Sequence, residues 1–400
     1  MASPPSRDSR GMSGIVGERT QTHPGRVWAE IDLGAVQENV RALRAALLAP
    51  ARLLAVVKAD AYGHGAVEVA RAAVEAGASG LGVATTEEGV QLRRAGIRAP
   101  VLLLGYTPPG DAETAVAHDL AVTVFQPDAA RAVSRAAGHL GRAARVHIKI
   151  DTGMGRVGVA PADAVGLARE IQALEGVTLE GCFTHFATAD DPDVAPARAQ
   201  LAAFLAALGD LEAAGVRPGL RHAANSAALL ALPESHLDLV RCGIALYGVA
   251  PAPHLAGRVP LVRVMRVRAR IGHVKRVDRG TPISYGHTYR ASRPTTIATI
   301  PVGYADGYFR LLSGRGEVLL HGRRVPVVGR VTMDQMMVDA GDLPVAAGDE
   351  AELWGEDLPV EDVAERAQTI SYEVLARLGR RVPRVFVRGG QVVGIRSLLD

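Results

Sequence analysis

Residues 52–65 read Arg52-Leu-Leu-Ala-Val-Val-Lys58-Ala-Asp-Ala-Tyr62-Gly-His-Gly65, and the unit that they begin recurs along the first half of the chain. An apolar run, too short to span a membrane, ends in Lys58. A glycine-rich segment follows, and a helical pattern begins at about Ala66. This order predicts a buried strand, a loop and a helix. A lysine that closes a strand is most often just solvated, so its position alone leaves the role of Lys58 open.

Lysine is scarce in this chain, which makes Lys58 conspicuous. Among 45 Lys and Arg residues only three are lysines, namely Lys58, Lys149 and Lys275. Arginine serves wherever a cation or a fork of donors is wanted, but its guanidinium is not a nucleophilic amine near neutral pH. The lysines that remain therefore suggest chemistry at the amine, either Schiff-base chemistry, general-base chemistry or carbamylation.

Short apolar runs alternate with alanine-rich stretches over the first 260 residues. A short strand is predicted at 28–33, followed by a helix whose apolar stripe is Val36, Val40, Leu43 and Leu47. Eight further strand candidates lie at about 52–57, 80–84, 101–104, 120–124, 145–150, 178–184, 220–223 and 237–241. Eight such units suit a (β/α)8 TIM-type barrel of about 250 residues. A doubly wound sheet would carry a Gly-rich phosphate fingerprint after its first strand, and none stands there.

The predicted strand ends support an active site, because this fold places its sites at the carboxyl ends of the barrel strands. Five of these ends carry polar or reactive side chains: Lys58, Lys149 with Asp151, His185, Asn225 with Ser226, and Arg241. Each residue alone could be a capping or loop residue. Their agreement on one rim predicts a site there.

After about Pro260 the hydrophobic period becomes two. Residues 262–271 nearly alternate, and later short runs separated by Gly, Pro and Asp lie at 296–302, 317–320, 324–329, 336–339, 350–354, 384–387 and 391–395. This pattern predicts an antiparallel, mainly-β C-terminal domain, interrupted by one helix at about 360–378. We therefore expect a disordered, dispensable tail at 1–25, a barrel at 26–260 and a β domain at 261–400.

Composition argues against several classes of protein. The 400 residues are 48% hydrophobic, enough for a sizeable core, and the net charge of +3 comes from scattered arginines that do not indicate nucleic-acid binding. The first 25 residues lack the apolar core of a signal peptide, and no stretch predicts a transmembrane helix. Cys182 and Cys242 fit neither a metal site nor a disulfide, so a cytoplasmic setting without a metal is expected.

Nine blocks follow one another along the chain in a specific order and spacing. They are Ala55-Val-Val-Lys58-Ala-Asp-Ala-Tyr62-Gly-His-Gly65, His147-Ile-Lys149-Ile-Asp151-Thr-Gly-Met-Gly-Arg156-Val-Gly158, Thr184-His185-Phe-Ala-Thr-Ala-Asp190, Asn225-Ser226-Ala, Arg241-Cys-Gly243-Ile244-Ala-Leu-Tyr-Gly248, Ile283-Ser-Tyr285-Gly, Val302-Gly-Tyr304-Ala-Asp-Gly-Tyr308, Gly329-Arg-Val-Thr-Met333-Asp334-Gln and Ile370-Ser-Tyr372-Glu-Val. Together they closely resemble the alanine racemases from about Arg26 to the C-terminus.

The resemblance implies an isomerase that interconverts L- and D-alanine and supplies D-alanine for cell-wall peptidoglycan. Alanine racemases carry pyridoxal 5'-phosphate (PLP) in a (β/α)8 barrel and work as homodimers whose sites borrow residues from the partner subunit. By this resemblance Lys58 holds PLP and acts as the base for the D antipode, and Tyr285 of the partner subunit acts on the L antipode. A tyrosine normally titrates near pH 10, so Tyr285 needs help, for which His185 and Arg241 are candidates.

The resemblance also assigns the remaining site residues. The residues expected to bind the phosphate of the cofactor are Tyr62, Ser226, Tyr372 and the backbone donors of Gly243 and Ile244. The other residues expected to bind the cofactor are His185, Asn225 and Arg241. Arg156 and the backbone at Met333 match contacts to the substrate carboxylate. Lys149 matches a lysine that is carbamylated in many members, where the new carboxylate would hold Arg156. Arg241 would face the pyridine nitrogen, and because it only donates, that nitrogen should stay unprotonated.

Two alternatives remain. One is another enzyme on the same scaffold, either a PLP decarboxylase, which should carry a carboxylate in place of Arg241, or a racemase for serine or a broader set of amino acids, since one hydroxyl changes a pocket little. The other is a non-catalytic PLP-binding protein. The C-terminal domain argues against a pure carrier, because it contributes Tyr285, Met333 and Tyr372.

Overall fold

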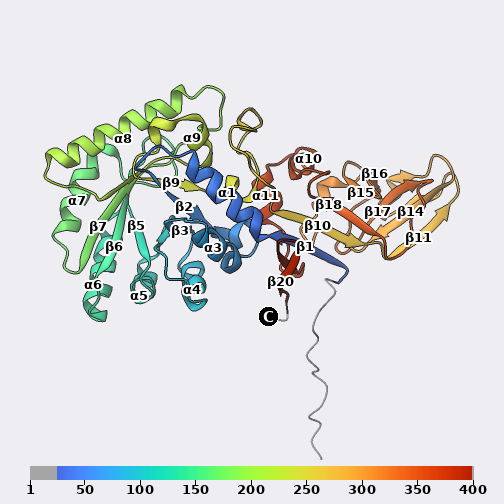
Figure 1. Ribbon diagram of the computed structural model, residues 1–400, viewed down its shortest axis with the longest axis horizontal. Helices are drawn as coiled ribbons and strands as arrows, with labels where there is room; N and C mark the ends of the chain where they lie inside the picture. The colour runs from blue at the N-terminus through green and yellow to red at the C-terminus, as the bar shows by residue number, and fades with distance from the viewer. Residues whose placement is uncertain (1–24, 399–400) are drawn as a thin grey trace, which may run out of the picture.

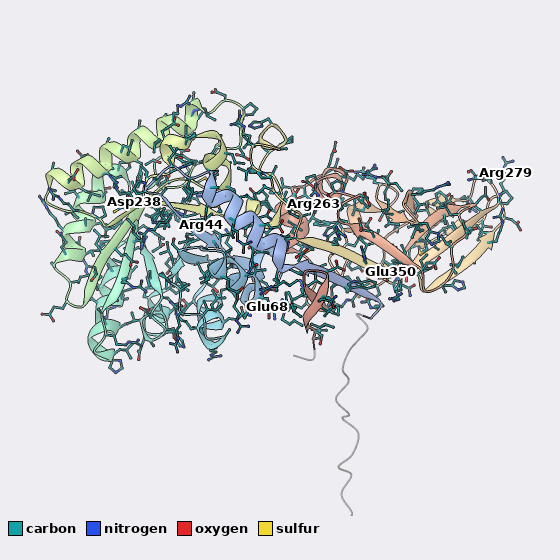
Figure 2. All side chains as sticks on the ribbon, in the orientation of Figure 1. Arg44, Glu68, Asp238, Arg263, Arg279 and Glu350 are labelled. Atoms are coloured by element: carbon teal, nitrogen blue, oxygen red, sulfur yellow. The ribbon has the colours of Figure 1, made fainter. Side chains whose placement is uncertain are left out.

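The computed structural model describes residues 25–398 and has a barrel at one end and an extended sheet at the other (Figure 1). The predicted tail at 1–25 lies outside the described residues except for Gly25. Charged side chains are found on both parts, with Asp238 on the barrel and Arg279 at the far end of the sheet (Figure 2). Among residues 25–398, none of the helices is long and apolar enough to cross a membrane.

The barrel prediction is confirmed. Eight parallel strands are hydrogen-bonded in the order β8-β7-β6-β5-β4-β3-β2-β9. Their bounds are β2 Arg52–Val56, β3 Gly80–Val83, β4 Val101–Leu103, β5 Ala121–Val124, β6 Ala144–Lys149, β7 Val177–Phe183, β8 Leu220–His222 and β9 Leu239–Cys242. Two backbone bonds of 3.0 Å, from Asp238 N to Arg221 O and from Arg241 N to Ala224 O, join β8 to β9. All eight predicted strands are therefore present, and the barrel is nearly closed.

Helices cover the outside of the barrel (Figure 1). They are α1 Leu33–Ala45, α3 Ala66–Glu75, α4 Thr86–Arg94, α5 Ala112–Ala117, α6 Pro127–Leu140, α7 Ala164–Gln172, α8 Ala195–Ala213 and α9 Ser226–Ala231. Local signals set their ends. Thr85 and Glu88 form a capping box before α4, and α6 begins with Pro127 and ends at Gly141 in the left-handed conformation.

The second part is a ten-stranded sheet with the order β11-β14-β17-β16-β15-β18-β10-β1-β19-β20. Its strands are β1 Val27–Asp32, β10 Met265–Arg270, β11 His273–Val277, β14 Thr295–Ile300, β15 Glu317–Leu320, β16 Arg323–Val328, β17 Met336–Gly341, β18 Glu350–Trp354, β19 Arg384–Arg388 and β20 Gln391–Arg396, with a separate hairpin of β12 Pro282–Ile283 and β13 Tyr289–Arg290. Each predicted C-terminal strand has a counterpart, whereas β11, β12 and β13 were not predicted.

The first strand of the chain belongs to this sheet and not to the barrel. β1 pairs antiparallel with β10, where Trp28 lies opposite Arg268, and parallel with β19, where Glu30 lies opposite Val385. The chain therefore passes through the second part before it enters the barrel. The β1–β19 pair is also the exception to the predicted antiparallel arrangement.

The prediction of one helix at 360–378 is wrong. Two short helices occupy it, α10 Val360–Arg366 and α11 Ser371–Ala376. Gln368 between them has φ +57°, which no right-handed helix contains. The break lets α11 lie against the barrel: a Cβ at Gly63, itself at φ +81°, would be 2.3 Å from the carbonyl oxygen of Leu375.

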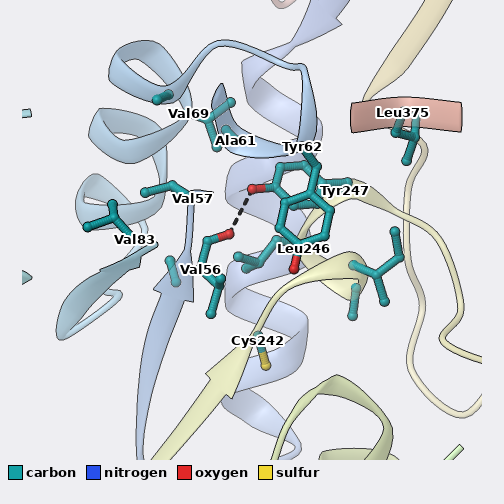
Figure 3. Packing of buried hydrophobic residues seen from close by; sticks show 14 of the residues in the cluster. Val56, Val57, Ala61, Tyr62, Val69, Val83, Cys242, Leu246, Tyr247 and Leu375 are labelled. Atoms are coloured by element: carbon teal, nitrogen blue, oxygen red, sulfur yellow. Dashed lines mark hydrogen bonds between the residues drawn. The ribbon is translucent and has the colours of Figure 1, made fainter. Parts of the chain in front are cut away.

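The core below the barrel mouth is built around two tyrosines (Figure 3). Tyr247 is 1% exposed, and its hydroxyl donates a 2.8 Å hydrogen bond to the carbonyl of Val56. The rings of Tyr247 and Tyr62 lie 4.8 Å apart. Because Val56 ends β2 two residues before Lys58, this bond ties the core to the strand end that carries the reactive lysine.

Candidate active site

A cavity of about 560 Å³ lies at the carboxyl ends of the barrel strands. All the predicted site residues line it except Tyr285, Met333 and the strand-end residue Asp151. Those that do are Lys58, Tyr62, Lys149, Arg156, His185, Asn225, Ser226, Arg241, Gly243, Ile244 and Tyr372. The barrel topology thus brings together side chains from Lys58 to Ile244, and α11 adds Tyr372 from the second part.

The cavity is strongly electropositive. Lys58, Lys149, Arg156 and Arg241 line it, and none of the described residues that line it is a carboxylate. Burial, followed by the charge of Arg156, lowers the pKa of Lys58, and burial with the same neighbour lowers the pKa of Lys149 to about 8. Burial and the nearby cations also hold the pKa of His185 well below its ordinary value. Such a cavity suits an anionic ligand, which would relieve the repulsion.

Lys58 opens a left-handed turn. In α2, Lys58–Tyr62, the residues Ala59, Asp60, Ala61 and Tyr62 have φ between 52° and 54°. The sequence predicted only a loop here. Left-handed backbone costs non-glycine residues roughly 1–2 kcal/mol each, so the surroundings must hold this turn.

Contacts from three other elements hold the turn. The amide of Ala59 donates to Glu88 Oε1 at 2.7 Å, and Arg384 Nε donates to the carbonyl of Gly63 at 2.9 Å. Asp60 Oδ1 accepts from Arg396 Nη1 at 3.0 Å. β19 and β20 therefore fix the segment that aims Lys58 and Tyr62 into the cavity.

Ser226, Gly243 and Tyr62 form one end of the cavity. Helix α9 begins at Ser226, and its N-cap is Asn225, whose side chain accepts from the amide of Ala228 at 2.9 Å. The Ser226 hydroxyl oxygen instead accepts from the amide of Gly243 at 2.9 Å. A Cβ on Gly243 would lie 2.5 Å from the Tyr62 hydroxyl, so only glycine leaves this space open. Hydroxyls and main-chain amides meet here, which is the donor set that a phosphate group needs.

Arg241 lies deeper and is 4% exposed. Nη2 donates to the carbonyl oxygens of Thr184 at 2.8 Å and Ala223 at 2.9 Å and contacts His185 Nδ1 at 3.2 Å. Nη1 donates to His222 Nδ1 at 2.8 Å. His222 was not predicted as a site residue, although it lies in a predicted strand, because a role that consists of holding Arg241 has no local signature.

Asp151 differs from the other strand-end residues. Its Oδ1 accepts from the amides of Gly153, Met154 and Gly155 at 2.9–3.1 Å, and it is not among the residues that line the cavity. Asp151 therefore shapes the loop that leads to Arg156. Lys149 lies at the cavity wall with its Nζ 5.4 Å from the centre of the Phe183 ring.

Tyr285 and Met333 lie in the second part of the molecule. Tyr285 begins a 3-10 turn that ends at His287 and is 71% exposed, and Met333 is 53% exposed. Neither lines the cavity of its own chain. Tyr285 and Met333 are therefore exposed on the surface of the second part, where another molecule could contact them.

Profiles of known families match the chain in two places. The alanine racemase N-terminal domain matches residues 31–251, and the alanine racemase C-terminal domain matches residues 264–386. The chain belongs to the alanine racemase family. The two matches cover the barrel and most of the sheet, so family membership rests on nearly the whole described chain.

Relatives in the alanine racemase family are similar over almost their full length. The alanine racemase of Symbiobacterium thermophilum is 54% identical over 369 residues, which is 91% of this chain and 97% of the relative. That of Desulfovibrio desulfuricans is 49% identical over 363 residues, 90% of this chain and 98% of the relative.

Solved structures of the alanine racemase family have the same architecture. The enzyme from Streptomyces lavendulae has a TM-score of 0.89 and 47% identity, covering 92% of this chain and 98% of that one. The structure from Bartonella henselae, which has covalently bound pyridoxal phosphate, has a TM-score of 0.83 and 33% identity, covering 91% and 100%.

Proposed function

We propose that the protein interconverts L- and D-alanine with PLP bound in the barrel cavity. The observation that carries the proposal is the cavity lined by Lys58, Lys149, Arg156 and Arg241 without a carboxylate. It suits a ligand with a phosphate and a substrate with a carboxylate, and Lys58 has its amine in the same space. Membership of the alanine racemase family supports the choice of alanine.

The cavity residues fit PLP. Tyr62, Ser226, Tyr372 and the amides of Gly243 and Ile244 would bind the phosphate, Arg241 would face the ring nitrogen, and Lys58 would hold the group covalently. When bound, PLP draws electrons from the substrate Cα and so makes its hydrogen acidic. The lowered pKa of Lys58 favours a neutral amine at Nζ, which can accept that proton once substrate is in place. Arg156, which lines the same cavity as Lys58, would bind the substrate carboxylate.

The second base would come from another copy of the chain. Racemisation needs a proton to be removed on one face of Cα and returned on the other, so a base is needed on each face. Lys58 serves one face, and Tyr285 of the partner subunit would serve the other, with Met333 of that subunit closing the site. The exposure of both residues and their absence from their own cavity support a homodimer with shared sites.

Lys149 would be carbamylated. Burial and Arg156 lower its pKa to about 8, so a sizeable fraction of the amine is neutral and able to react with CO₂ near that pH. The resulting carboxylate would add a negative group beside Arg156 and hold its guanidinium for the substrate.

The test is incubation of PLP-loaded protein with L-alanine in deuterated water, followed by an assay for D-alanine that carries deuterium at Cα. We expect deuterated D-alanine from the wild type, none from Lys58→Ala, and wild-type amounts from Lys275→Ala, the exposed lysine on β11. Absence of D-alanine from the wild type would refute the proposal. L-serine under the same conditions distinguishes a serine or broad-specificity racemase, and cofactor binding without any exchange identifies a binding protein.

A further inference from the structure

A line of four side chains crosses the barrel behind the cavity. It begins at Arg241 on β9, whose Nη1 is 2.8 Å from His222 Nδ1 on β8. His222 Nε2 is 2.9 Å from His147 Nδ1 on β6, and His147 Nε2 is 3.0 Å from Glu180 Oε2 on β7. Both histidines are buried, and Glu180 reaches the surface with 28% of its side chain exposed. The mechanism proposed above uses neither histidine and does not use Glu180.

The chemistry of the two ends allows one arrangement of protons. Arginine only donates, so His222 Nδ1 must accept and its Nε2 must carry hydrogen. That hydrogen faces His147 Nδ1, which must therefore accept, and the hydrogen on His147 Nε2 is left to donate to the carboxylate of Glu180. Burial holds the pKa of His222 well below its ordinary value, and the hydrogen bond from His147 lowers the pKa of Glu180, so a neutral His222 and an ionised Glu180 agree with this order.

Three features of the backbone and packing build this line. Val146 pairs with Leu179 and His147 with Gly181, so Glu180 is the extra residue of a β-bulge, which aims its side chain toward His147. A Cβ at Gly181 would lie 2.6 Å from His147 Nδ1, so a larger residue would displace that ring. The His222 ring stacks on Phe183 with 4.7 Å between centroids and 6° between planes.

The outer end is held as well. Arg145 Nη1 donates to Glu180 Oε1 at 3.3 Å, and Arg145 Nη2 donates to Asp119 Oδ1 at 2.9 Å. One carboxylate oxygen of Glu180 is thereby occupied by an arginine, and the other faces the histidine.

We propose that Glu180 is a positioning residue for Arg241, acting through His147 and His222. The ionised carboxylate fixes the tautomer of His147, so that His147 Nδ1 accepts from His222 Nε2 and holds the His222 ring in place. The acceptor that His222 then presents fixes the plane of the guanidinium that would face the cofactor ring. Without the carboxylate, His147 can reverse its tautomer, and its Nδ1 hydrogen would then face the Nε2 hydrogen of His222 and push the His222 ring away from its place beside Arg241. The inference rests on the proposed function only in assigning Arg241 to the cofactor ring. The histidine tautomers do not depend on the cofactor or on the reaction.

The first test is two-bond ¹H–¹⁵N correlation of full-length, PLP-loaded protein labelled with ¹⁵N-histidine, with the two rings assigned from His147→Asn and His222→Asn samples. We expect both rings to be neutral with hydrogen on Nε2. Hydrogen on Nδ1 of either ring, or an imidazolium, overturns the inference. This readout needs no substrate, so it stands even if the protein fails to racemise alanine.

The second test compares Glu180→Gln with Glu234→Gln, a control that removes another arginine-paired surface glutamate, bonded to Arg198 at 2.9 Å. In Glu180→Gln we expect mixed tautomers at His147 and a fall in kcat of about ten-fold at nearly unchanged KM, the lower range for loss of an outer-sphere hydrogen-bond partner. Glu234→Gln should behave as wild type. Unchanged kcat in Glu180→Gln overturns the inference, and so does reduced kcat with wild-type tautomers. If Glu180→Gln does not fold, Glu180→Asp, which keeps the charge but withdraws it from His147, takes its place with the same expectations.

Discussion

Two variants that are each inactive should restore activity when their subunits are mixed, because Lys58 and Tyr285 lie in different parts of one chain. Lys58 lines the cavity, whereas Tyr285 is 71% exposed and does not line it. If each site takes its lysine from one subunit and its tyrosine from the other, Lys58→Ala and Tyr285→Phe homodimers are each defective in both sites. Loss of either base should lower kcat by about 10²- to 10⁴-fold.

The size of the recovery follows from counting sites. Random association of equal amounts of the two variants makes about half of the dimers mixed, and each mixed dimer has one site with both native residues. About one quarter of all sites are then native, so activity per subunit should reach about 25% of wild type. A site built within one chain would gain nothing from mixing.

The assay co-expresses the two variants with different tags, isolates the mixture and measures D-alanine formed per subunit with saturating PLP. The matched control mixes Lys58→Ala with the double variant Lys58→Ala/Tyr285→Phe, in which no pairing creates a native site. Activity equal to the sum of the two separate variants would refute the shared site. Near wild-type activity in Tyr285→Phe alone would refute the role of Tyr285 itself.

Three further outcomes follow from the structure. In CO₂-free buffer, the melting temperature of the wild type should rise relative to that of Lys149→Gln as the pH increases from about 8 to 10.5. In this pH range the lowered pKa of Lys149 makes the unfolded chain bind more protons than the folded chain. Melting temperatures of the two proteins that change in parallel with pH would contradict this prediction. Tyr247→Phe leaves the buried carbonyl at the end of β2 unpaired and should lower the free energy of unfolding in urea by about 1–3 kcal/mol, whereas a loss under about 0.5 kcal/mol would speak against that bond. Arg396→Leu removes the hydrogen bond to Asp60 that holds the left-handed turn, and a loss of about 1 kcal/mol there should raise the Kd for PLP about fivefold. Arg388→Leu on the neighbouring strand should leave the Kd unchanged. Equal Kd values for the two variants in spectroscopic titrations would show that Arg396 does not support the PLP site.

The barrel was predictable because each strand–turn–helix unit has a recognisable local sequence pattern. A short apolar run, a turn and an alanine-rich helix appear in sequence order, and parallel strands with helical connections have few arrangements. The rule that sites lie at strand ends then placed Lys58, Lys149, His185, Ser226 and Arg241 together, and the cavity contains all five. Their individual roles came from family resemblance and stay proposals.

Features that depend on distant contacts were not predictable. The left-handed turn after Lys58 is held partly by Arg396, which lies 336 residues from Asp60 along the chain. The break at Gln368 has no glycine or proline to announce it, and α11 is set by its close approach to Gly63. The line from Arg241 to Glu180 joins four strands across the barrel, so no local pattern reveals it.

The position of β1 in the sheet constrains how the protein can fold while it is being synthesised. β1 leaves the ribosome first, but its partners are β10 at Met265–Arg270 and β19 at Arg384–Arg388. At a synthesis rate of roughly 5–20 residues per second, its two edges stay uncovered for on the order of half a minute. A nascent chain can complete the barrel strands in that time, but it cannot bury its own first strand until translation is nearly finished. N-terminal fragments that end after the barrel would keep both edges of β1 open to pairing with other chains.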